Sequence, residues 1–166
     1  MEPQSEHEGK LYYTQEQLQR DVYLLFQEMP GELNRQTDVI IGVSRGGLVP
    51  AVMLSHLTGL DMVPLRWSFR DSPGGMMLEA SRLIRTVTDF RRIFIVEDIC
   101  DTGKTIKTMQ DVLAGSFHPS LSLAREITFM CLWKNTQNTT PVDVVAREID
   151  REVDRRFIVF PWEECL

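Results

Sequence analysis

Residues 93–106 read IFIVEDICDTGKTI, and this stretch indicates the fold of the chain. It opens with a short apolar, β-branched run that is typical of a strand buried inside a parallel sheet. It continues through a polar loop into a helix near Thr105. Gly103 has no side chain, so the backbone of that loop can come close to another group. A strand, a loop and a helix in succession are the repeating unit of α/β proteins, so the stretch predicts a parallel sheet flanked by helices.

The rest of the chain repeats this alternation. A capping box at Thr14–Gln17 precedes apolar residues at helical spacing up to Pro30. Further helices are predicted at 48–57 and 105–113, and further strands at 38–43, 62–69, 127–133, 142–146 and 157–160. We expect residues 1–12 to be a flexible N-terminus and residues 13–166 to be a single domain.

Composition narrows the class of protein. The chain has 166 residues, 43% of them hydrophobic, with 18 Lys and Arg against 24 Asp and Glu and a net charge of −6. This balance argues against general nucleic-acid binding, but it leaves room for a small anionic ligand held by backbone amides. No apolar run reaches the roughly 18 residues that span a bilayer, the start is acidic and polar, and the three cysteines are scattered. We therefore expect a cytoplasmic protein without a membrane partner.

The loop after the strand at 93–96 has the chemistry of a sugar-phosphate site. Glu97 and Asp98 are adjacent carboxylates that repel each other, so they favour cations or hydroxyl donors, and Asp101 adds a third acid. Thr102–Thr105 then offer hydroxyls and helix-start amides that suit a phosphate. A Walker A loop is excluded because position 98 would have to be glycine. The alternative is an acidic strand end followed by an ordinary capped helix.

Two other segments are expected where a parallel sheet binds its ligands, beyond the carboxyl ends of its strands: Ser44–Gly47 and the region after Trp133. Ser44-Arg45-Gly46-Gly47 offers amides, a hydroxyl and a guanidinium to an anion, unless it is a simple turn with an exposed arginine. Ser44 breaks the dinucleotide-binding fingerprint in this loop. Residues 67–77 read either as a surface hairpin or as a lid that excludes water, with Arg66 and Arg70 within reach of the anion.

The stretch at 93–106 resembles the phosphoribosyl-pyrophosphate signature of type I phosphoribosyltransferases. That signature is an apolar strand, two acids, two further residues and then Asp-Thr-Gly-x-Thr, and the first acid, often Asp, is Glu97 here. The resemblance implies that Glu97 and Asp98 contact the ribose hydroxyls and, through these and water, Mg²⁺. It implies that Asp101 lies at the reacting centre as the acid or base, and that Asp101, Thr102, Gly103, Lys104 and Thr105 hold the 5′-phosphate.

Other parts of the chain resemble the small xanthine-guanine and hypoxanthine (6-oxopurine) members of this family. Residues 42–50 resemble their pyrophosphate-binding loop, which implies that Ser44, Arg45, Gly46 and Gly47 bind pyrophosphate and predicts a cis peptide at or beside Ser44–Arg45. Lys134 is where such enzymes place a donor to the purine O6 atom. In a hood formed mainly by residues 147–166, Phe157 would stack on the purine and the backbone of Ile158 would read its 2-position. Phe157 departs from the Trp usual in bacterial members.

The resemblance implies a transfer of the 5-phosphoribosyl group from phosphoribosyl pyrophosphate to guanine, xanthine or hypoxanthine, with Mg²⁺ as cofactor and a homo-oligomer, a dimer or tetramer, as the assembly. Three alternatives stay open: a non-catalytic regulator that binds phosphoribosyl pyrophosphate, an enzyme for another base, and a phosphoacceptor domain that uses Asp98. Lys134 could equally be a solvated charge, and residues 157–160 a core strand. Cys100 and Trp162 are expected to fill space.

Overall fold

The chain folds around a parallel sheet. A computed structural model describes residues 9–67, 73–116 and 126–163. In these ranges five parallel strands stand in the order β3-β2-β4-β5-β6. Their bounds are Asp38–Ser44 (β2), Met62–Arg66 (β3), Arg92–Cys100 (β4), Glu126–Asn135 (β5) and Val144–Ile149 (β6). The predicted parallel α/β fold is confirmed.

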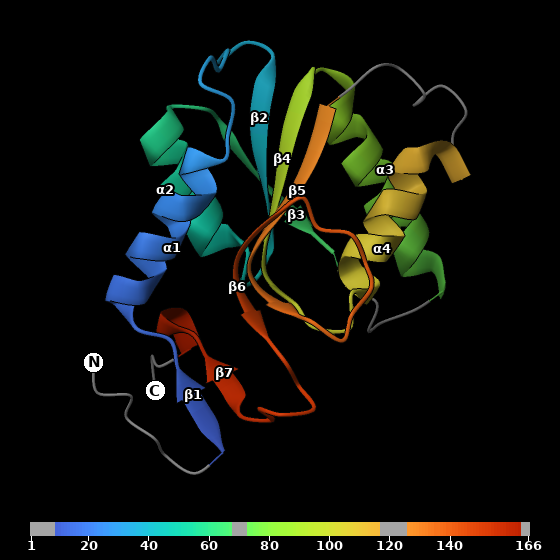
Figure 1. The fold of residues 1–166 in the computed structure, drawn as a ribbon. Coiled ribbons are helices and arrows are strands. Elements are labelled where there is room, and N and C mark those ends of the chain that lie inside the picture. Colours follow the sequence, from blue (N-terminus) through green and yellow to red (C-terminus); the bar gives the residue numbers. More distant parts are fainter. Residues whose placement is uncertain (1–8, 68–72, 117–125, 164–166) are drawn as a thin grey trace.

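Helices cover both faces of this sheet (Figure 1). The helices α1 (Gln15–Gln27) and α2 (Leu48–Thr58) lie on one face, and α3 (Pro73–Thr88) and α4 (Lys104–Asp111) lie on the other, with a π-helical turn at Val112–Ser116 after α4. Ile40 packs in the apolar layer between the sheet and the helices α1 and α2, whereas Val39 and Ile41 pack in the layer between the sheet and the helices α3 and α4. This alternation explains why the residues of β2 from Val39 to Ile41 are all apolar. None of the helices in the described ranges combines the length and apolarity needed to cross a bilayer.

The ends of α1 and α2 follow their sequence signals. The Thr14 hydroxyl accepts from the Gln17 amide at 3.2 Å, and the Gln17 side chain accepts from the Thr14 amide at 3.0 Å, so the predicted capping box is present. The helix α2 ends at Gly59, whose left-handed φ of 71° favours glycine.

The helix α3 corrects the prediction for residues 67–77. That segment was expected to be a loop, either a surface hairpin or a lid, but α3 begins at Pro73; residues 68–72, including Arg70, lie outside the described residues. Proline is compatible with the first turn of a helix because its missing amide has no partner there. The buried residues Ala80, Leu83 and Val87 follow at helical spacing and hold α3 against the sheet.

A second, small sheet lies at the end of the large sheet where its strands finish (Figure 1). It pairs β1 (Lys10–Tyr12) in parallel with β7 (Phe157–Val159), which a short 3-10 helix at Pro161–Glu163 follows. Lys10–Tyr12 were expected to belong to a flexible N-terminus; instead they form a strand, because β7 supplies a hydrogen-bonding edge that the local sequence does not reveal. This small sheet, which we call the hood together with Pro161–Glu163, overlaps the hood predicted at 147–166 and is built from both ends of the chain.

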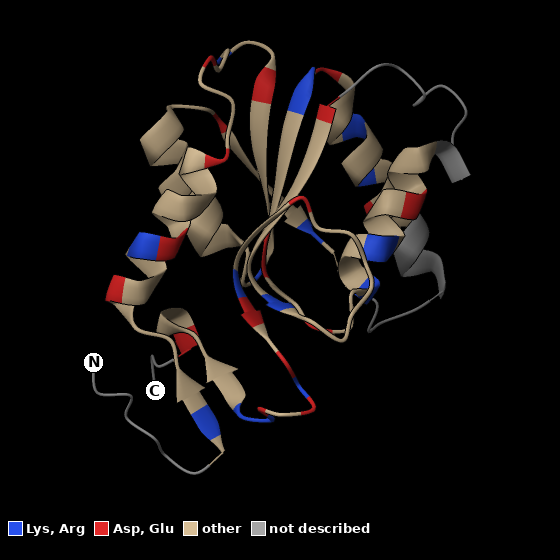
Figure 2. Ribbon diagram, viewed as in Figure 1, with Lys and Arg blue, Asp and Glu red and all other residues tan. Residues whose placement is uncertain are grey.

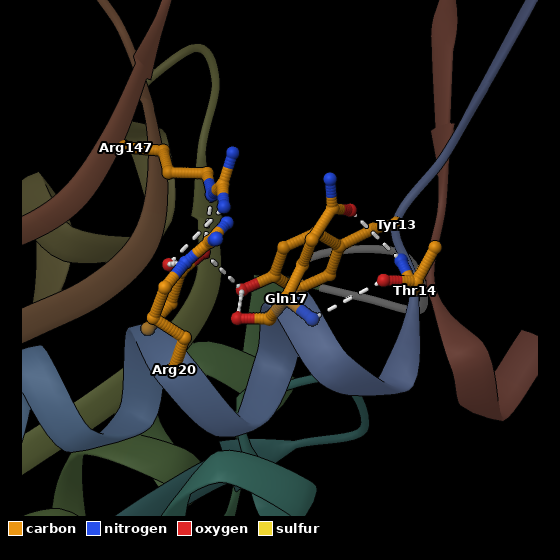
Figure 3. A network of polar contacts seen from close by, with 6 residues as sticks. Tyr13, Thr14, Gln17, Arg20 and Arg147 are labelled. Atoms are coloured by element: carbon orange, nitrogen blue, oxygen red, sulfur yellow. Dashed lines mark hydrogen bonds and ion pairs between the residues drawn. The ribbon is translucent and has the colours of Figure 1, made fainter. Parts of the chain in front are cut away.

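Tyr13 anchors this hood to the large sheet and to α1 (Figure 3). Its hydroxyl donates to Asp21 Oδ2 at 2.6 Å, and Arg147 on β6 binds the same carboxylate. The Tyr13 ring meets Trp133 and Phe160 edge-on at 5.8 and 5.6 Å. Burial and the bond to Asp21 raise the pKa of the Tyr13 hydroxyl well above its ordinary value, so it stays a donor.

Candidate functional site

The candidate site lies where the chain changes direction in the large sheet. From β2 the chain moves to β3 on one side, and it then returns to β4 on the other side. Ligands of such sheets bind at this switch point, outside the carboxyl ends of the strands. The loops that leave β2 and β4 here are those predicted to bind pyrophosphate and phosphoribose. The pairing of β2 with β4 ends at Gly42 and Val96, so the two chains separate beyond these residues.

Two glycines bring the loop after β2 against β4. A Cβ atom on Gly46 would collide with the Asp98 carboxylate, and one on Gly47 would collide with the backbone carbonyl oxygens of Val43 and Val96. A larger residue at either position would therefore displace its neighbour. The predicted cis peptide between Ser44 and Arg45 is present. The two predicted ligand loops are therefore in direct contact.

The acid pair near the end of β4 has no basic side chain paired with it among the residues that the structure describes. Glu97 is buried and Asp98 partly buried. Glu97 Oε1 accepts from the Asp98 amide at 3.1 Å, and Asp98 Oδ1 accepts from the Ile99 amide at 2.7 Å. Within the described ranges neither carboxylate forms an ion pair with Lys or Arg.

Burial and neighbouring charge make this pair hard to ionise. Burial, and then the charge of Asp98, raises the pKa of Glu97 well above its ordinary value. Burial also raises the pKa of Asp98, and the negative charge of Glu163 from the hood adds to the effect. A divalent cation or sugar hydroxyls at this point would relieve the repulsion.

The start of α4 is the segment predicted to bind the 5′-phosphate. Gly103 precedes the helix with a left-handed φ of 73°, and a Cβ atom there would collide with the side chains of Thr140 and Asn138. The N-cap residue Gly103 has no side chain to cap the helix, and the Lys104 amide donates to the Thr102 hydroxyl at 3.4 Å. The amides of the first turn that follow Lys104 have no partner within the helix and suit a phosphate.

Lys134 on β5 and Cys100 on β4 are register partners on neighbouring strands. Lys134 was expected just after a strand, but β5 extends to Asn135, and Lys134 pairs in register with Cys100. Cys100 is buried and its sulfur accepts from Asn138 Nδ2 at 3.2 Å. Burial raises the pKa of the Cys100 thiol, which supports a space-filling role. Lys134 thus stands one strand away from the acidic loop.

The hood presents the exposed ring of Phe157. Phe157 is 61% exposed, whereas the side chain of Ile158 is buried. The Phe157 amide donates to the Gly9 carbonyl, and the Val159 carbonyl accepts from the Tyr13 amide. The backbone groups of Phe157 and Val159 therefore point toward β1. Backbone groups alternate in direction along a strand, and those of Ile158 therefore point away from β1. Trp162 stacks on Phe160 at 4.8 Å, as a packing residue would.

Sequence reasoning missed four residues that border these groups: Asn138, Thr140, Arg151 and Glu163. The first two support Gly103, and Arg151 forms an ion pair with Asp101 at 3.4 Å. Their contacts join segments far apart in the chain, so no local pattern could have revealed them.

Comparison with known proteins defines the class. Residues 10–166 match the model of the phosphoribosyl transferase domain, and the chain belongs to this family. A curated xanthine-guanine phosphoribosyltransferase from Cereibacter sphaeroides is 24% identical to this chain, and the match covers 96% of this chain and 90% of that protein.

Solved structures agree with this class. A purine phosphoribosyltransferase from Pyrococcus horikoshii is 29% identical with a TM-score of 0.66, covering 96% of this chain and 97% of that one. A xanthine-guanine-hypoxanthine phosphoribosyltransferase from Helicobacter pylori shares the fold, with a TM-score of 0.68 at 18% identity over 92% of each chain.

Proposed function

We propose that this chain is a Mg²⁺-dependent purine phosphoribosyltransferase that transfers the 5-phosphoribosyl group from phosphoribosyl pyrophosphate to a 6-oxopurine base. The observation that carries the proposal is the contact of Gly46 with Asp98, because it joins a pyrophosphate loop to a ribose-binding acid pair at the switch point. Family membership and the purine-specific names of the Cereibacter and Pyrococcus relatives support the same reaction.

The donor would lie across the two loops. The amides of Ser44–Gly47 and the guanidinium of Arg45 suit the pyrophosphate, and Thr102–Thr105 at the start of α4 suit the 5′-phosphate. Glu97 and Asp98 would bind the ribose hydroxyls between them. Mg²⁺ fits this acid pair, held indirectly through those hydroxyls and water, and when bound it would offset the charge of the leaving pyrophosphate.

The base would lie between β5 and the hood. Lys134 carries an ammonium group that can donate to O6 of the purine, and the exposed face of Phe157 can stack on its rings. The outward backbone groups of Ile158 can read the 2-position. Adenine has an amino group at position 6, so a cationic donor there disfavours it.

The chemistry exchanges one bond for another at the anomeric carbon. As pyrophosphate leaves, Arg45 and the loop amides stabilise its charge, and a ring nitrogen of the base attacks the carbon from the other side. Holding both reactants in line removes much of the entropic cost. Asp101, with a side chain 46% exposed, would accept or return the proton of the purine ring nitrogen.

One assay tests the reaction. The purified chain is incubated with Mg²⁺, phosphoribosyl pyrophosphate and, separately, guanine, xanthine, hypoxanthine, adenine, orotate or uracil, and the nucleotide is identified by mass spectrometry. We expect the 5′-monophosphates of 6-oxopurines, together with pyrophosphate, and loss of product when Mg²⁺ is chelated. Product from adenine or a pyrimidine alone would contradict the substrate, and donor binding without any product would indicate a regulator.

A further inference from the structure

Arg151, in the turn after β6, contacts three different parts of the candidate site. Its Nε donates to Asp101 Oδ1 at 3.4 Å, and the two side chains form an ion pair. Its Nη1 donates to the carbonyl oxygen of Arg156 at 2.5 Å, and its own amide donates to Asn135 Oδ1 at 3.4 Å. Acidic and basic residues stand close together along this connection between β6 and β7 (Figure 2).

Each of these partners is a group that would handle the purine, or is its direct neighbour in the chain. Asp101 is the proposed acid or base. Arg156 immediately precedes Phe157, whose ring would stack on the base, and Asn135 immediately follows Lys134, which would bind O6. One residue thus joins the loop after β4, the end of β5 and the start of β7.

We propose that Arg151 is a positioning residue of the purine site, and that its guanidinium holds the Asp101 carboxylate at a fixed place relative to the ring of Phe157. The inference rests on the proposed function and deepens it, because it names a residue that aligns the proton-transfer group with the bound base. Arg151 itself need not touch the purine.

The guanidinium suits this task. It is planar and carries donors in fixed directions, so it can bind a carboxylate and a carbonyl oxygen at once, whereas a lysine ammonium acts as a point charge on a flexible stem. The Asp101 side chain is 46% exposed and that of Arg151 only 20%. A carboxylate on an exposed loop would otherwise populate several rotamers, and the more buried guanidinium restricts it.

The other end of this bridge is itself fixed. Asp154 accepts from the amide, Nε and Nη2 of Arg156 at 3.1, 3.0 and 2.8 Å. These bonds lower the pKa of Asp154 to about 2, so the carboxylate stays charged at neutral pH. Arg151 therefore ties the acidic loop to a rigid turn, and the turn leads directly into β7.

Stability alone does not account for the contact. Partly exposed ion pairs contribute little to folding, and the carboxylate in this pair is the one proposed to move a proton. A positioning role predicts a kinetic effect confined to the base side of the reaction, whereas a structural role predicts a lower unfolding temperature.

Three variants separate these roles: Arg151→Met, Arg151→Lys and, as the matched control, Arg155→Met, which removes an exposed arginine from the same turn. Steady-state rates are measured against the purine and the donor separately, donor binding is measured by calorimetry, and unfolding temperatures are recorded. Hydrogen exchange of the amides at 99–103 and 156–159 gives a readout that does not depend on activity.

For Arg151→Met we expect kcat/KM for the purine to fall about a hundredfold, because small misplacements of a reacting group have effects of that size. Donor affinity and unfolding temperature should stay unchanged, and exchange at 99–103 and 156–159 should accelerate. Arg151→Lys should remain close to Arg151→Met, and Arg155→Met should match the wild type. An active wild type whose Arg151→Met variant keeps its purine kinetics, or loses donor affinity equally, overturns the inference. A wild type inactive with every base overturns the proposed function instead.

Discussion

Gly46 lies so close to the carboxylate of Asp98 that a Cβ atom at position 46 would displace that side chain. The contact joins two segments that would bind opposite ends of one donor molecule. A ligand spanning the pyrophosphate loop and the acid pair would depend on this spacing. Substituting Gly46 therefore tests the proposed donor site without any knowledge of the base.

Gly46→Ala should impair the site and spare the fold. The new methyl group meets a side chain that can rotate away, so Asp98 moves, and we expect kcat/KM to fall about a hundredfold. Gly47→Ala is the contrasting variant, because its methyl group meets backbone carbonyl oxygens of β2 and β4 that cannot move independently. Gly47→Ala should lower the unfolding temperature measured by circular dichroism. Equal effects of both variants on stability would contradict this distinction.

Asp101→Asn should slow turnover much more than it weakens donor binding. The amide keeps the size of the side chain but cannot accept the purine proton, and general acid–base catalysis contributes about a hundred- to ten-thousandfold to rates. Single-turnover rates and calorimetric donor affinities measure the two quantities separately. Equal losses in both would show that Asp101 binds the donor and does not transfer a proton.

Lys134→Ala should reduce the use of 6-oxopurines and leave adenine unused. A hydrogen bond from a charged donor contributes about 1.5–3 kcal/mol, so kcat/KM for the preferred purine should fall about ten- to a hundredfold. Competition assays with hypoxanthine and adenine provide the measurement. Lys104→Ala serves as the control on the phosphate side and should raise the KM of the donor instead. Unchanged purine kinetics in Lys134→Ala would remove the lysine from the base site.

The sequence sufficed for the parts of the fold that local patterns determine. The capping box at Thr14–Gln17, the apolar strands of the large sheet and the loop before α4 each depend on residues close together in the chain. The cis peptide at Ser44–Arg45 followed from resemblance to a family and not from local propensity.

Elements and contacts whose partners are far away in the sequence were not predicted. The strand β1 has three residues and exists because β7, near the other end of the chain, pairs with it. Asp101 and Arg151 are 50 residues apart, and Asp21 and Arg147 are 126 apart. The start of α3 was misjudged for a different reason, because Pro73 and the glycines after it are as common in turns as in a first helical turn.

Glu97 should make the metal-free protein less stable as the pH rises. Burial raises its pKa above the ordinary value of 4.5, so the folded state keeps a proton that the unfolded chain releases. Stability is therefore fullest below the unfolded pKa, and it is lost as the pH rises toward the folded pKa. Glu97→Gln cannot titrate, and its unfolding temperature should fall less between about pH 5 and 8 than that of the wild type. The exposed Glu28→Gln is the control, and parallel pH profiles for wild type and Glu97→Gln would refute the prediction.

Arg147→Met should destabilise the attachment of the hood. The variant leaves the Asp21 carboxylate, which is 1% exposed, without its main partner, and breaking a buried ion pair in this way costs about 3–5 kcal/mol. Arg20 provides the matched control, because it contacts the same carboxylate at 3.7 Å but is 52% exposed (Figure 3). Arg20→Met should cost no more than about 1 kcal/mol in urea unfolding. If both variants unfold at the same urea concentration, the buried pair does not hold the hood, and the edge-on contacts of Tyr13 with Trp133 and Phe160 would have to hold it alone.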